Sequence, residues 1–411
     1  MNEKSKTIDR CQISGIKDLK TILSLGYLPP VNKLKKIHSK LNEDVFFPAE
    51  LLFSPSSKLV QLSTIVNKEI LFPKEYPYTS STTKVLRENF KELYSDCKKI
   101  INILSDDLVI DIGSNDGNLL NNFKKNHRVL GITPEKIGKI AIRRGIPTLI
   151  RYFDKPTVNM VTKKYGKAKI ITATNVFAHI ENVTELMRNI LKVLDKDGVF
   201  ISESHYLVSL IQTNQYDTIY HEHLRYYSLT SLKYLLEKFG MEIIHAKKIN
   251  THGGSIRVYA AKKNKFEVTK NVKKILDFEK KFLNWKTFNN FKKKVVNSKI
   301  ELYSILKKLK KKNKKIYGVG APSRASTLIS YVGLDENIID CVLEIDGSYK
   351  IGNYIPGTKI PIISEKKLYK NQPEFVILFS WHIAAELKKN LKKNGYKGKF
   401  IIPLPYPKIE S

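Results

Sequence analysis

Two short segments of the chain gather residue types that can do chemistry. The first, residues 108–120, has the sequence LVIDIGSNDGNLL, an apolar stretch that ends in a polar turn with two glycines. Glycines at a strand end let the main chain approach a ligand, and open α/β sheets bind ligands beyond the carboxyl ends of their strands. The turn is therefore a candidate ligand-binding loop, formed by Asp111, Gly113, Ser114, Asn115, Asp116 and Gly117.

The second segment, residues 216–229, has the sequence YDTIYHEHLRYYSL and places Tyr220, His221, Glu222 and His223 in a row. A His-x-His pair can bind a metal, but the spacing supplies no third ligand. The tyrosines can also be core aromatics that carry their hydroxyls to a polar rim. Because four such polar groups are costly to bury without purpose, a functional role is favoured.

The elements around these segments alternate between helix and strand. Residues 84–104 have apolar residues at helical spacing, and helices are also expected at 118–125 and 183–194. Apolar strands are expected at 108–113, 128–133, 169–175, 199–205 and 251–261. This order predicts a parallel sheet covered by helices.

The two ends of the chain differ from this central part. Residues 1–73 have short apolar runs broken by prolines, which predicts a small irregular module. Residues 265–312 are lysine-rich and helical in period. A second strand-turn-helix unit opens at residue 314, and strands are expected at 338–346, 374–381 and 398–404, so the last hundred residues predict another α/β domain.

Composition narrows the class of protein. A length of 411 residues favours two or three domains. The net charge of +33 comes from lysines spread along the whole chain, and the one dense run, residues 307–315, is typical of a solvated helix end, so nucleic acid is not expected as a partner. The three cysteines are scattered, which predicts a cytoplasmic protein without disulfides. The sequence shows no apolar signal segment and no apolar run of membrane-spanning length, so we expect a soluble protein without a membrane partner.

The spacing D-x-G-x-x-x-G of residues 111–117 resembles the first motif of class I methyltransferases. Together with further segments it resembles the sugar C-methyltransferases that act on keto-deoxysugar nucleotides, such as the tetronitrose type. The resemblance spans nearly the whole chain, and its other matching segments are EYPYTSSTT, NVFAHIENV, YDTIYHEH, HGGSIRVY, YGVGAPSRASTL and GNYIPGTKIPI.

This resemblance implies three domains and a reaction. The domains are an N-terminal zinc-type module (1–73), a central class I, Rossmann-like methyltransferase domain (74–264), and a helical linker with a second Rossmann-like α/β domain (265–411). The implied cofactor is S-adenosylmethionine. The implied substrate is a nucleotide-linked keto-sugar, contacted in part by the flanking domains, and the implied product carries a new methyl group on carbon.

The resemblance also implies roles for single residues. His223 matches the general base, Tyr220, Glu222 and His179 match other active-site groups, and Tyr76 or Tyr78 matches a tyrosine from the N-terminal side. The chemistry suits these residue types, because a histidine near neutrality can remove a proton alpha to a ketone and hydroxyl donors can stabilise the enolate.

The sequence departs from the family at two places. The strand-end position that commonly carries a ribose-binding acid is Thr133, so Glu135 is a candidate substitute, and Asn175 completes the expected cofactor-binding set. The zinc positions of the N-terminal module match Cys11, Ser14, Ser54 and Ser57, and because hydroxyls are poor zinc ligands we expect the metal to be absent.

Three alternatives remain open at this point. The first is O- or N-methylation of a small molecule, and the second is a nucleic-acid methyltransferase, which lacks support in any basic-aromatic stripe. The third is a partner subunit that binds cofactor without turnover, which Thr133 and the missing cysteines keep open.

The loop at residues 318–324 contains Arg324, which can contact phosphate or lie in solvent.

Overall fold

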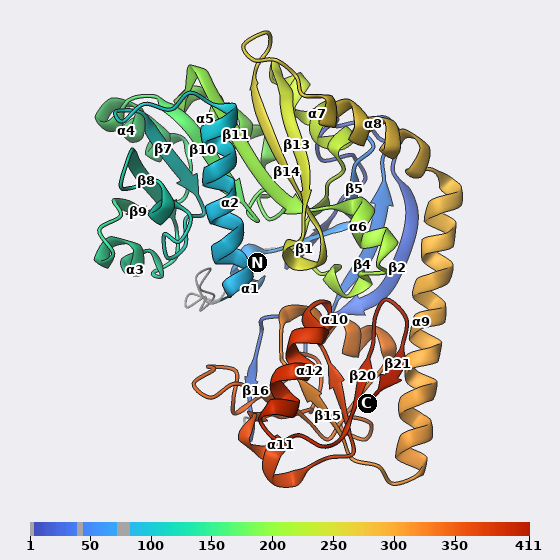
Figure 1. Ribbon diagram of the computed structural model, residues 1–411. Helices are drawn as coiled ribbons and strands as arrows, with labels where there is room; N and C mark the ends of the chain where they lie inside the picture. Colours follow the sequence, from blue (N-terminus) through green and yellow to red (C-terminus); the bar gives the residue numbers. More distant parts are fainter. Residues whose placement is uncertain (1–3, 39–43, 72–82) are drawn as a thin grey trace.

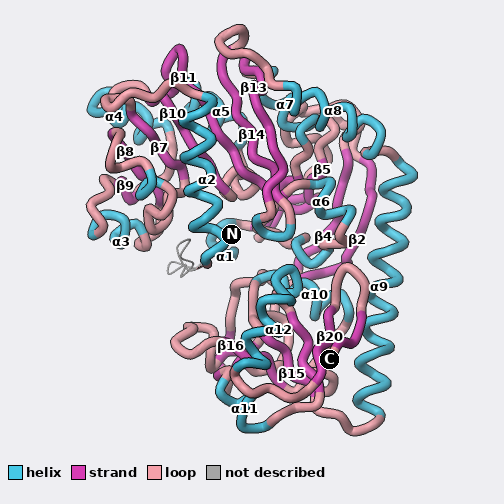
Figure 2. Tube along the Cα trace, in the orientation of Figure 1, coloured by secondary structure: helices cyan, strands magenta, loops and turns pink. Residues whose placement is uncertain are grey.

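The computed structural model describes residues 4–38, 44–71 and 83–411 and has three parts, each with its own sheet (Figure 1). We refer to them as the N-terminal module (β1–β6 and α1), the central domain (α2–β14) and the C-terminal domain (β15–β21). The long helix α9 runs along one side and connects the central domain to the C-terminal domain (Figure 2).

The N-terminal module is built from short antiparallel strands. Its elements are β1 (Ser5–Thr7), β2 (Lys20–Leu28), β3 (Lys35–Lys36), β4 (Phe47–Phe53), β5 (Val60–Leu62), β6 (Thr64–Val66) and α1 (Lys68–Leu71). Its four-stranded sheet has the order β12-β5-β4-β2, and β12 (Arg225–Tyr226) comes from the central domain. The segment that follows His223 therefore completes the sheet of the module.

The central domain has a seven-stranded sheet in the order β13-β14-β11-β10-β7-β8-β9. Its strands are parallel except β14, which is antiparallel to both neighbours. The strands are β7 (Leu108–Ile112), β8 (Arg128–Thr133), β9 (Thr148–Ile150), β10 (Ala168–Thr174), β11 (Leu194–His205), β13 (Met241–Ile249) and β14 (Ser255–Lys262).

Helices cover both faces of this sheet. The helical elements are α2 (Lys84–Ile100), η2 (Leu120–Asn122), α3 (Gly138–Arg143), α4 (Lys155–Tyr165), α5 (Val183–Val193), α6 (Leu207–Gln212), η3 (Tyr216–Thr218), α7 (Leu229–Lys238) and η4 (Thr251–Gly253). Side chains alternate across a strand, so Val109 packs under α2 while Ile110 packs toward α4 and α5. The predicted helix-covered sheet is confirmed, with one antiparallel strand.

The predicted helix at 118–125 is wrong, because only the three-residue turn η2 forms there. The amide of Asn122 donates to the carbonyl oxygens of Asn118 and Leu119, at 3.1 Å each. Asparagine side chains that bond to nearby main-chain groups compete with the regular helix pattern.

The C-terminal domain has a six-stranded sheet in the order β18-β16-β15-β19-β20-β21, parallel except for β21. The chain reaches it through α8 (Lys270–Phe282) and α9 (Trp285–Lys311), so the dense lysine run falls at a helix end. Its other elements are β15 (Ile316–Val319), α10 (Ser323–Val332), β16 (Cys341–Glu344), β17 (Asn353–Tyr354), β18 (Ile362–Ser364), α11 (Lys366–Asn371), β19 (Phe375–Leu378), η5 (Trp381–Ile383), α12 (Ala384–Lys393), β20 (Lys399–Ile402) and β21 (Lys408–Glu410).

The C-terminal domain also contacts the N-terminal module directly. Strand β17 pairs antiparallel with β3, and the methylene carbons of Pro29 lie against Gly357. A Cβ atom on Gly357 would lie 2.8 Å from Pro29 Cγ, which is closer than van der Waals contact allows.

Among the described residues, no helix has the length and apolar character that crossing a bilayer requires.

Candidate active site

One cavity of about 2490 Å³ lies where the three parts meet. Its wall includes the turn after β7, the segment Tyr220–His223, and the start of α10 in the C-terminal domain. A pocket for one small ligand usually has a volume of about 300–1,000 Å³. The cavity therefore has room for a cofactor and a substrate together.

The glycines of the turn are required by packing. Gly113 and Gly117 have φ of +73° and +78°, in the left-handed region that favours glycine. A Cβ atom on Gly113 would lie 2.3 Å from Val176 Cγ2, and one on Gly117 would lie 2.6 Å from Ile146 Cδ1. The glycines thus let the turn pack against neighbouring strands and loops, while Gly113, Ser114 and Asn115 still line the cavity.

Asp111 ends the strand in front of the turn and is 2% exposed. Burial raises its pKa to about 7, although the hydroxyl of Thr172 donates to its Oδ1 at 2.6 Å and the nearby Glu203 raises it further. Asp111 lines the cavity, but Asp116 does not; it is fully buried and paired with Arg144 Nη1 at 3.1 Å.

Of the residues expected near the ribose and the rest of the cofactor, Glu135 and Asn175 line the cavity and Thr133 lies behind its wall. Thr133 is fully buried, and its hydroxyl donates to Glu135 Oε2 at 2.6 Å. Glu135 lines the cavity, whereas Thr133 does not. Asn175 also lines it, in a left-handed conformation (φ 57°), with its main-chain N–H donating to the carbonyl oxygen of Glu203 at 2.8 Å.

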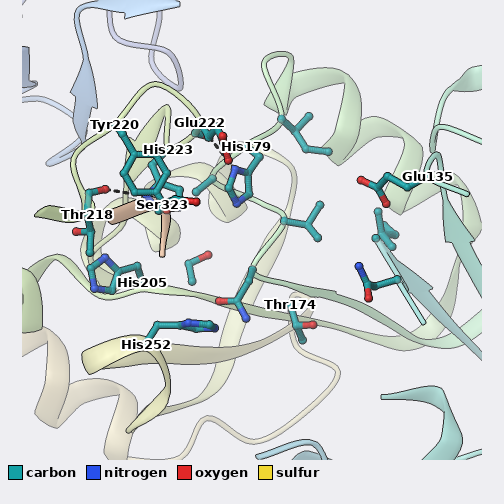
Figure 3. A pocket seen from close by; sticks show the side chains of 18 of the residues that line it. Glu135, Thr174, His179, His205, Thr218, Tyr220, Glu222, His223, His252 and Ser323 are labelled. Atoms are coloured by element: carbon teal, nitrogen blue, oxygen red, sulfur yellow. Dashed lines mark hydrogen bonds between the residues drawn. The ribbon is translucent and has the colours of Figure 1, made fainter. Parts of the chain in front are cut away.

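His223 is held by a contact that fixes its tautomer (Figure 3). Its Nδ1 lies 2.8 Å from the carbonyl oxygen of Thr218, and because a carbonyl only accepts, Nδ1 carries the proton. In the neutral ring Nε2 then keeps its lone pair. Burial, followed by the adjacent His179, holds the pKa of His223 well below its usual value, so the basic form is present at neutral pH.

The remaining members of the cluster surround this ring. His179 lies with its ring centroid 5.0 Å from that of His223, and its Nδ1 is 2.7 Å from the carbonyl oxygen of Glu222. The Tyr220 ring lies 4.2 Å from His223, and burial raises the pKa of its hydroxyl, which keeps it a hydrogen-bond donor. The Glu222 carboxylate accepts from Asn32 Nδ2 at 2.6 Å, and burial raises its pKa to about 7. Tyr76 and Tyr78 lie outside the described residues.

His221, the other histidine of the segment, has a different environment. It is 1% exposed, its Nε2 lies 3.0 Å from the carbonyl oxygen of Pro48, and its ring packs edge-on against Phe47. Among the described residues, no group of three or more His, Cys, Asp or Glu side chains is arranged to hold a metal ion. His221 therefore contacts the N-terminal module, whereas His223 lines the cavity.

Polar residues to which the sequence motifs assign no role also line the wall, among them His205, His252, Lys350 and His382. Burial and then the charge of Arg324 lower the pKa of His205 and His382 to about 3 and that of His252 to about 4. The position of two of these residues in the chain could have marked them as candidate site residues. His205 ends strand β11, and His252 adjoins the glycine pair before β14.

Arg324 is not solvated, and it lies on the wall of the cavity with its guanidinium paired inside the protein. It is 7% exposed, and its guanidinium pairs with Asp217 and packs over the ring of Trp381. It joins the C-terminal domain to the turn that precedes the Tyr220–His223 segment.

Comparison with known proteins covers all three parts of the chain. Family models match residues 11–72 as a putative zinc binding domain, residues 86–246 as a methyltransferase domain, and residues 250–405 as a C-methyltransferase C-terminal domain. C-methyltransferase NovU of Streptomyces niveus is 29% identical over 419 residues, which cover 100% of this chain and 99% of NovU. The chain is an S-adenosylmethionine-dependent C-methyltransferase. Its central domain has the expected class I, Rossmann-like fold, flanked by the expected N-terminal module and C-terminal α/β domain.

Each of two similar solved structures covers less than half of this C-methyltransferase. Magnesium protoporphyrin IX methyltransferase (ChlM) from Synechocystis PCC 6803 is 13% identical, covering 43% of this chain and 79% of its own, with a TM-score of 0.33. YcgJ from Bacillus subtilis is 14% identical, covering 43% and 98%, with a TM-score of 0.34.

The polar groups on the wall of the C-methyltransferase cavity fit the cofactor. Glu135 offers a carboxylate that can accept from two vicinal hydroxyls, as a ribose requires. The hydroxyls of Ser204 and Thr251 line the cavity and are buried without a hydrogen-bond partner among the described residues. Buried polar atoms of this kind point to a ligand that satisfies them.

The zinc positions of the N-terminal module do not fit the metal. Cys11 Sγ lies 3.1 Å from Ser57 Oγ, and Ser54 Oγ donates to Asp18 at 2.8 Å. A structural zinc site needs four nitrogen or thiolate ligands, and here hydroxyl hydrogen bonds occupy their place. Of the four matched positions only Cys11 offers a thiolate, so the residues present do not fit a zinc ion although the family model matches the module.

Proposed function

We propose that this C-methyltransferase methylates the carbon alpha to the ketone of a nucleotide-linked keto-deoxysugar, as a cytoplasmic enzyme of polysaccharide or natural-product sugar biosynthesis. The observation that carries the proposal is the fixed tautomer of His223 on the cavity that also contains the turn after β7. Cytoplasmic location draws support from the three cysteines, which are free and buried.

The proposed chemistry begins with a proton. Nε2 of His223 takes the proton from the carbon alpha to the ketone, and the electron pair of that C–H bond moves to form an enolate. The resulting imidazolium keeps its Nδ1–H bond to the Thr218 carbonyl, so the ring does not have to turn. Tyr220 has its hydroxyl available to donate to the enolate oxygen because the pKa of that group is raised.

The second step forms the carbon–carbon bond. When bound, S-adenosylmethionine supplies an electrophilic methyl group on a positively charged sulfur and leaves as a neutral thioether. The role of the protein here is to hold the nucleophilic carbon in line and to exclude water, which is worth more than further acid–base help. Gly113, Val176 and Tyr220 all line the cavity in which this step would take place.

The nucleotide part of the substrate has support from the C-terminal domain. Lys350 lines the cavity, is held by the carbonyl oxygen of Ala321, and is the kind of group that an anionic diphosphate attracts. The full-length match to NovU supports a carbon atom rather than oxygen or nitrogen as the acceptor.

The direct test is methyl transfer itself. Purified enzyme is incubated with methyl-labelled S-adenosylmethionine and a panel of keto-deoxysugar nucleotides, and the products are assigned by NMR. We expect label on a ring carbon next to the ketone of at least one substrate. Label found only on oxygen or nitrogen, or on no member of the panel while a non-nucleotide ketone is methylated, would overturn the proposal.

A further inference from the structure

A single asparagine connects all three parts of the protein at the active site. The hydroxyl of Ser323, in the C-terminal domain, donates to Asn32 Oδ1 at 3.0 Å. The amide of Asn32, in the N-terminal module, donates to Glu222 Oε1 at 2.6 Å. Figure 3 shows Ser323 and Glu222 on the same side of the cavity as His223. These two hydrogen bonds form a relay from one flanking domain, through the other, to the central domain.

The local sequence fixes Asn32 in place. It follows β2 and the buried residues Pro29, Pro30 and Val31, and the prolines restrict the backbone because their rings set φ. A turn in which Lys33 N–H donates to the carbonyl oxygen of Pro30, at 3.1 Å, holds the other side. Because the backbone is constrained on both sides, the amide is presented to Glu222 with little freedom to move.

The relay has a defined direction. An amide nitrogen only donates and an amide oxygen only accepts, so the nitrogen must face the carboxylate and the oxygen must face the serine hydroxyl. Glu222 is 3% exposed, and a carboxylate this deeply buried needs donors. Among the described residues, the donor to the Glu222 side chain is Asn32. Asn32 itself does not line the cavity.

Glu222 in turn contacts His179 through its main chain. Its carbonyl oxygen lies 2.7 Å from Nδ1 of His179, and the ring of His179 lies beside that of His223. The ionisable groups that face its carboxylate are Lys350 and Tyr349 from the C-terminal domain and Tyr220 from its own segment. A shift of this carboxylate therefore moves the wall that the substrate ring would contact.

We infer that Asn32 is a positioning residue for Glu222 and that, through Ser323, it makes the catalytic geometry depend on the seating of the C-terminal domain. The inference rests on the proposed function for its kinetic consequence, but not for the geometry. It assigns to the N-terminal module a role in catalysis that needs no metal. Asn32 acts through Glu222 and touches neither the substrate nor the cofactor.

The deciding variant is Asn32→Asp, which has nearly the same shape but replaces the donor with an acceptor. If Asn32 only filled space, Asn32→Asp would retain turnover and Asn32→Ala would lose it. For a positioning donor we expect Asn32→Asp to lower kcat by about 10- to 100-fold, at least as much as Asn32→Ala, with cofactor affinity unchanged. Lys33→Ala, at the exposed neighbouring position, is the matched control and keeps wild-type kcat.

A second readout does not depend on turnover. In protein labelled with ¹³C-glutamate, the Glu222 carboxyl resonance is assigned by its loss in Glu222→Gln and is titrated with pH. We expect its pKa to move upward in Asn32→Asp, because a donor is lost and a like charge is gained. Ser323→Ala, which removes only the outer bond, should lower kcat less, and thermal unfolding verifies that each variant is folded.

The outcomes separate this inference from the proposed function. Unchanged kcat and an unchanged Glu222 titration in folded Asn32→Asp would overturn the relay, whatever the substrate. An upward shift of the titration, in an enzyme whose wild type methylates no keto-sugar nucleotide, would retain the relay and discard the proposed substrate.

Discussion

Nη2 of Arg324 lies 2.9 Å from Oδ1 of Asp217, and this buried ion pair links α10 of the C-terminal domain to η3 of the central domain. Asp217 is 1% exposed, and Trp381 Nε1 donates to its other oxygen at 2.7 Å. The turn so held leads within three residues to Tyr220. The ion pair therefore supports the same segment that the Asn32 relay contacts at Glu222.

Loss of Arg324 should be costly. Arg324→Met leaves Asp217 buried with no cation, and removal of one partner of a buried pair typically destabilises by about 3–5 kcal/mol. Denaturant unfolding measures the effect, and Lys366→Met, which breaks an exposed pair with Asp346, is the control and should leave stability close to that of the wild type. Equal small effects from both variants would contradict a structural role for the Arg324–Asp217 pair.

Glu135, rather than Thr133, should determine cofactor affinity. Glu135→Gln removes the charge from the carboxylate on the wall, and we expect S-adenosylmethionine to bind about 10- to 100-fold more weakly by calorimetry. Thr133→Val removes only the hydroxyl that supports Glu135, so its effect should be smaller. The assignment fails if Glu135→Gln binds the cofactor as tightly as the wild type.

The raised pKa of Glu222 makes stability depend on pH in a defined direction. The unfolded carboxyl ionises near pH 4.5 and the folded one has a pKa of about 7, so between these values the folded state holds the extra proton. The stabilisation that this extra proton gives the folded state is complete below pH 4.5 and is lost as pH rises through 7. The difference between the two pKa values corresponds to roughly 3 kcal/mol. Relative to wild type, Glu222→Gln should gain about that amount between pH 4.5 and pH 8. Parallel stability curves for the two proteins would contradict it.

The N-terminal module should fold and function without metal. Since three of the four zinc positions are Ser14, Ser54 and Ser57, we expect far less than one zinc per chain and an unchanged Tm in the presence of a strong chelator. Cys11→Ser should cost only the packing and hydrogen bonding of one buried thiol. Stoichiometric, tightly held zinc in the purified protein would refute this.

Local patterns in the sequence predicted the central sheet and the turn after β7, because strand, glycine turn and strand spacing are properties of adjacent residues. The helix at 118–125 failed for an equally local reason, the side-chain bonds of Asn122. Histidines at strand ends, such as His205, carried a positional signal that composition alone did not reveal.

The contacts between domains lay beyond sequence reasoning. Asn32 is 190 residues from Glu222 and 291 residues from Ser323, and no periodicity relates such positions. Strand β12 likewise belongs by sequence to the central domain and by hydrogen bonding to the sheet of the N-terminal module. Such pairings arise only when separately folded units pack together, so the chemistry of one residue gives no indication of its partner.

The central claim is that Nε2 of His223 removes a proton from carbon, and solvent exchange tests it without requiring methyl transfer. Enzyme, a keto-deoxysugar nucleotide that serves as substrate and S-adenosylhomocysteine are incubated in D₂O, and deuterium alpha to the ketone is followed by NMR. His223→Asn keeps an amide donor for the Thr218 carbonyl but has no base, and His127→Asn is the control, since His127 has a similar carbonyl contact outside the cavity. We predict exchange in the wild type and His127→Asn, and exchange lowered at least about 100-fold in His223→Asn with cofactor affinity retained. Exchange at the wild-type rate in His223→Asn would contradict the account.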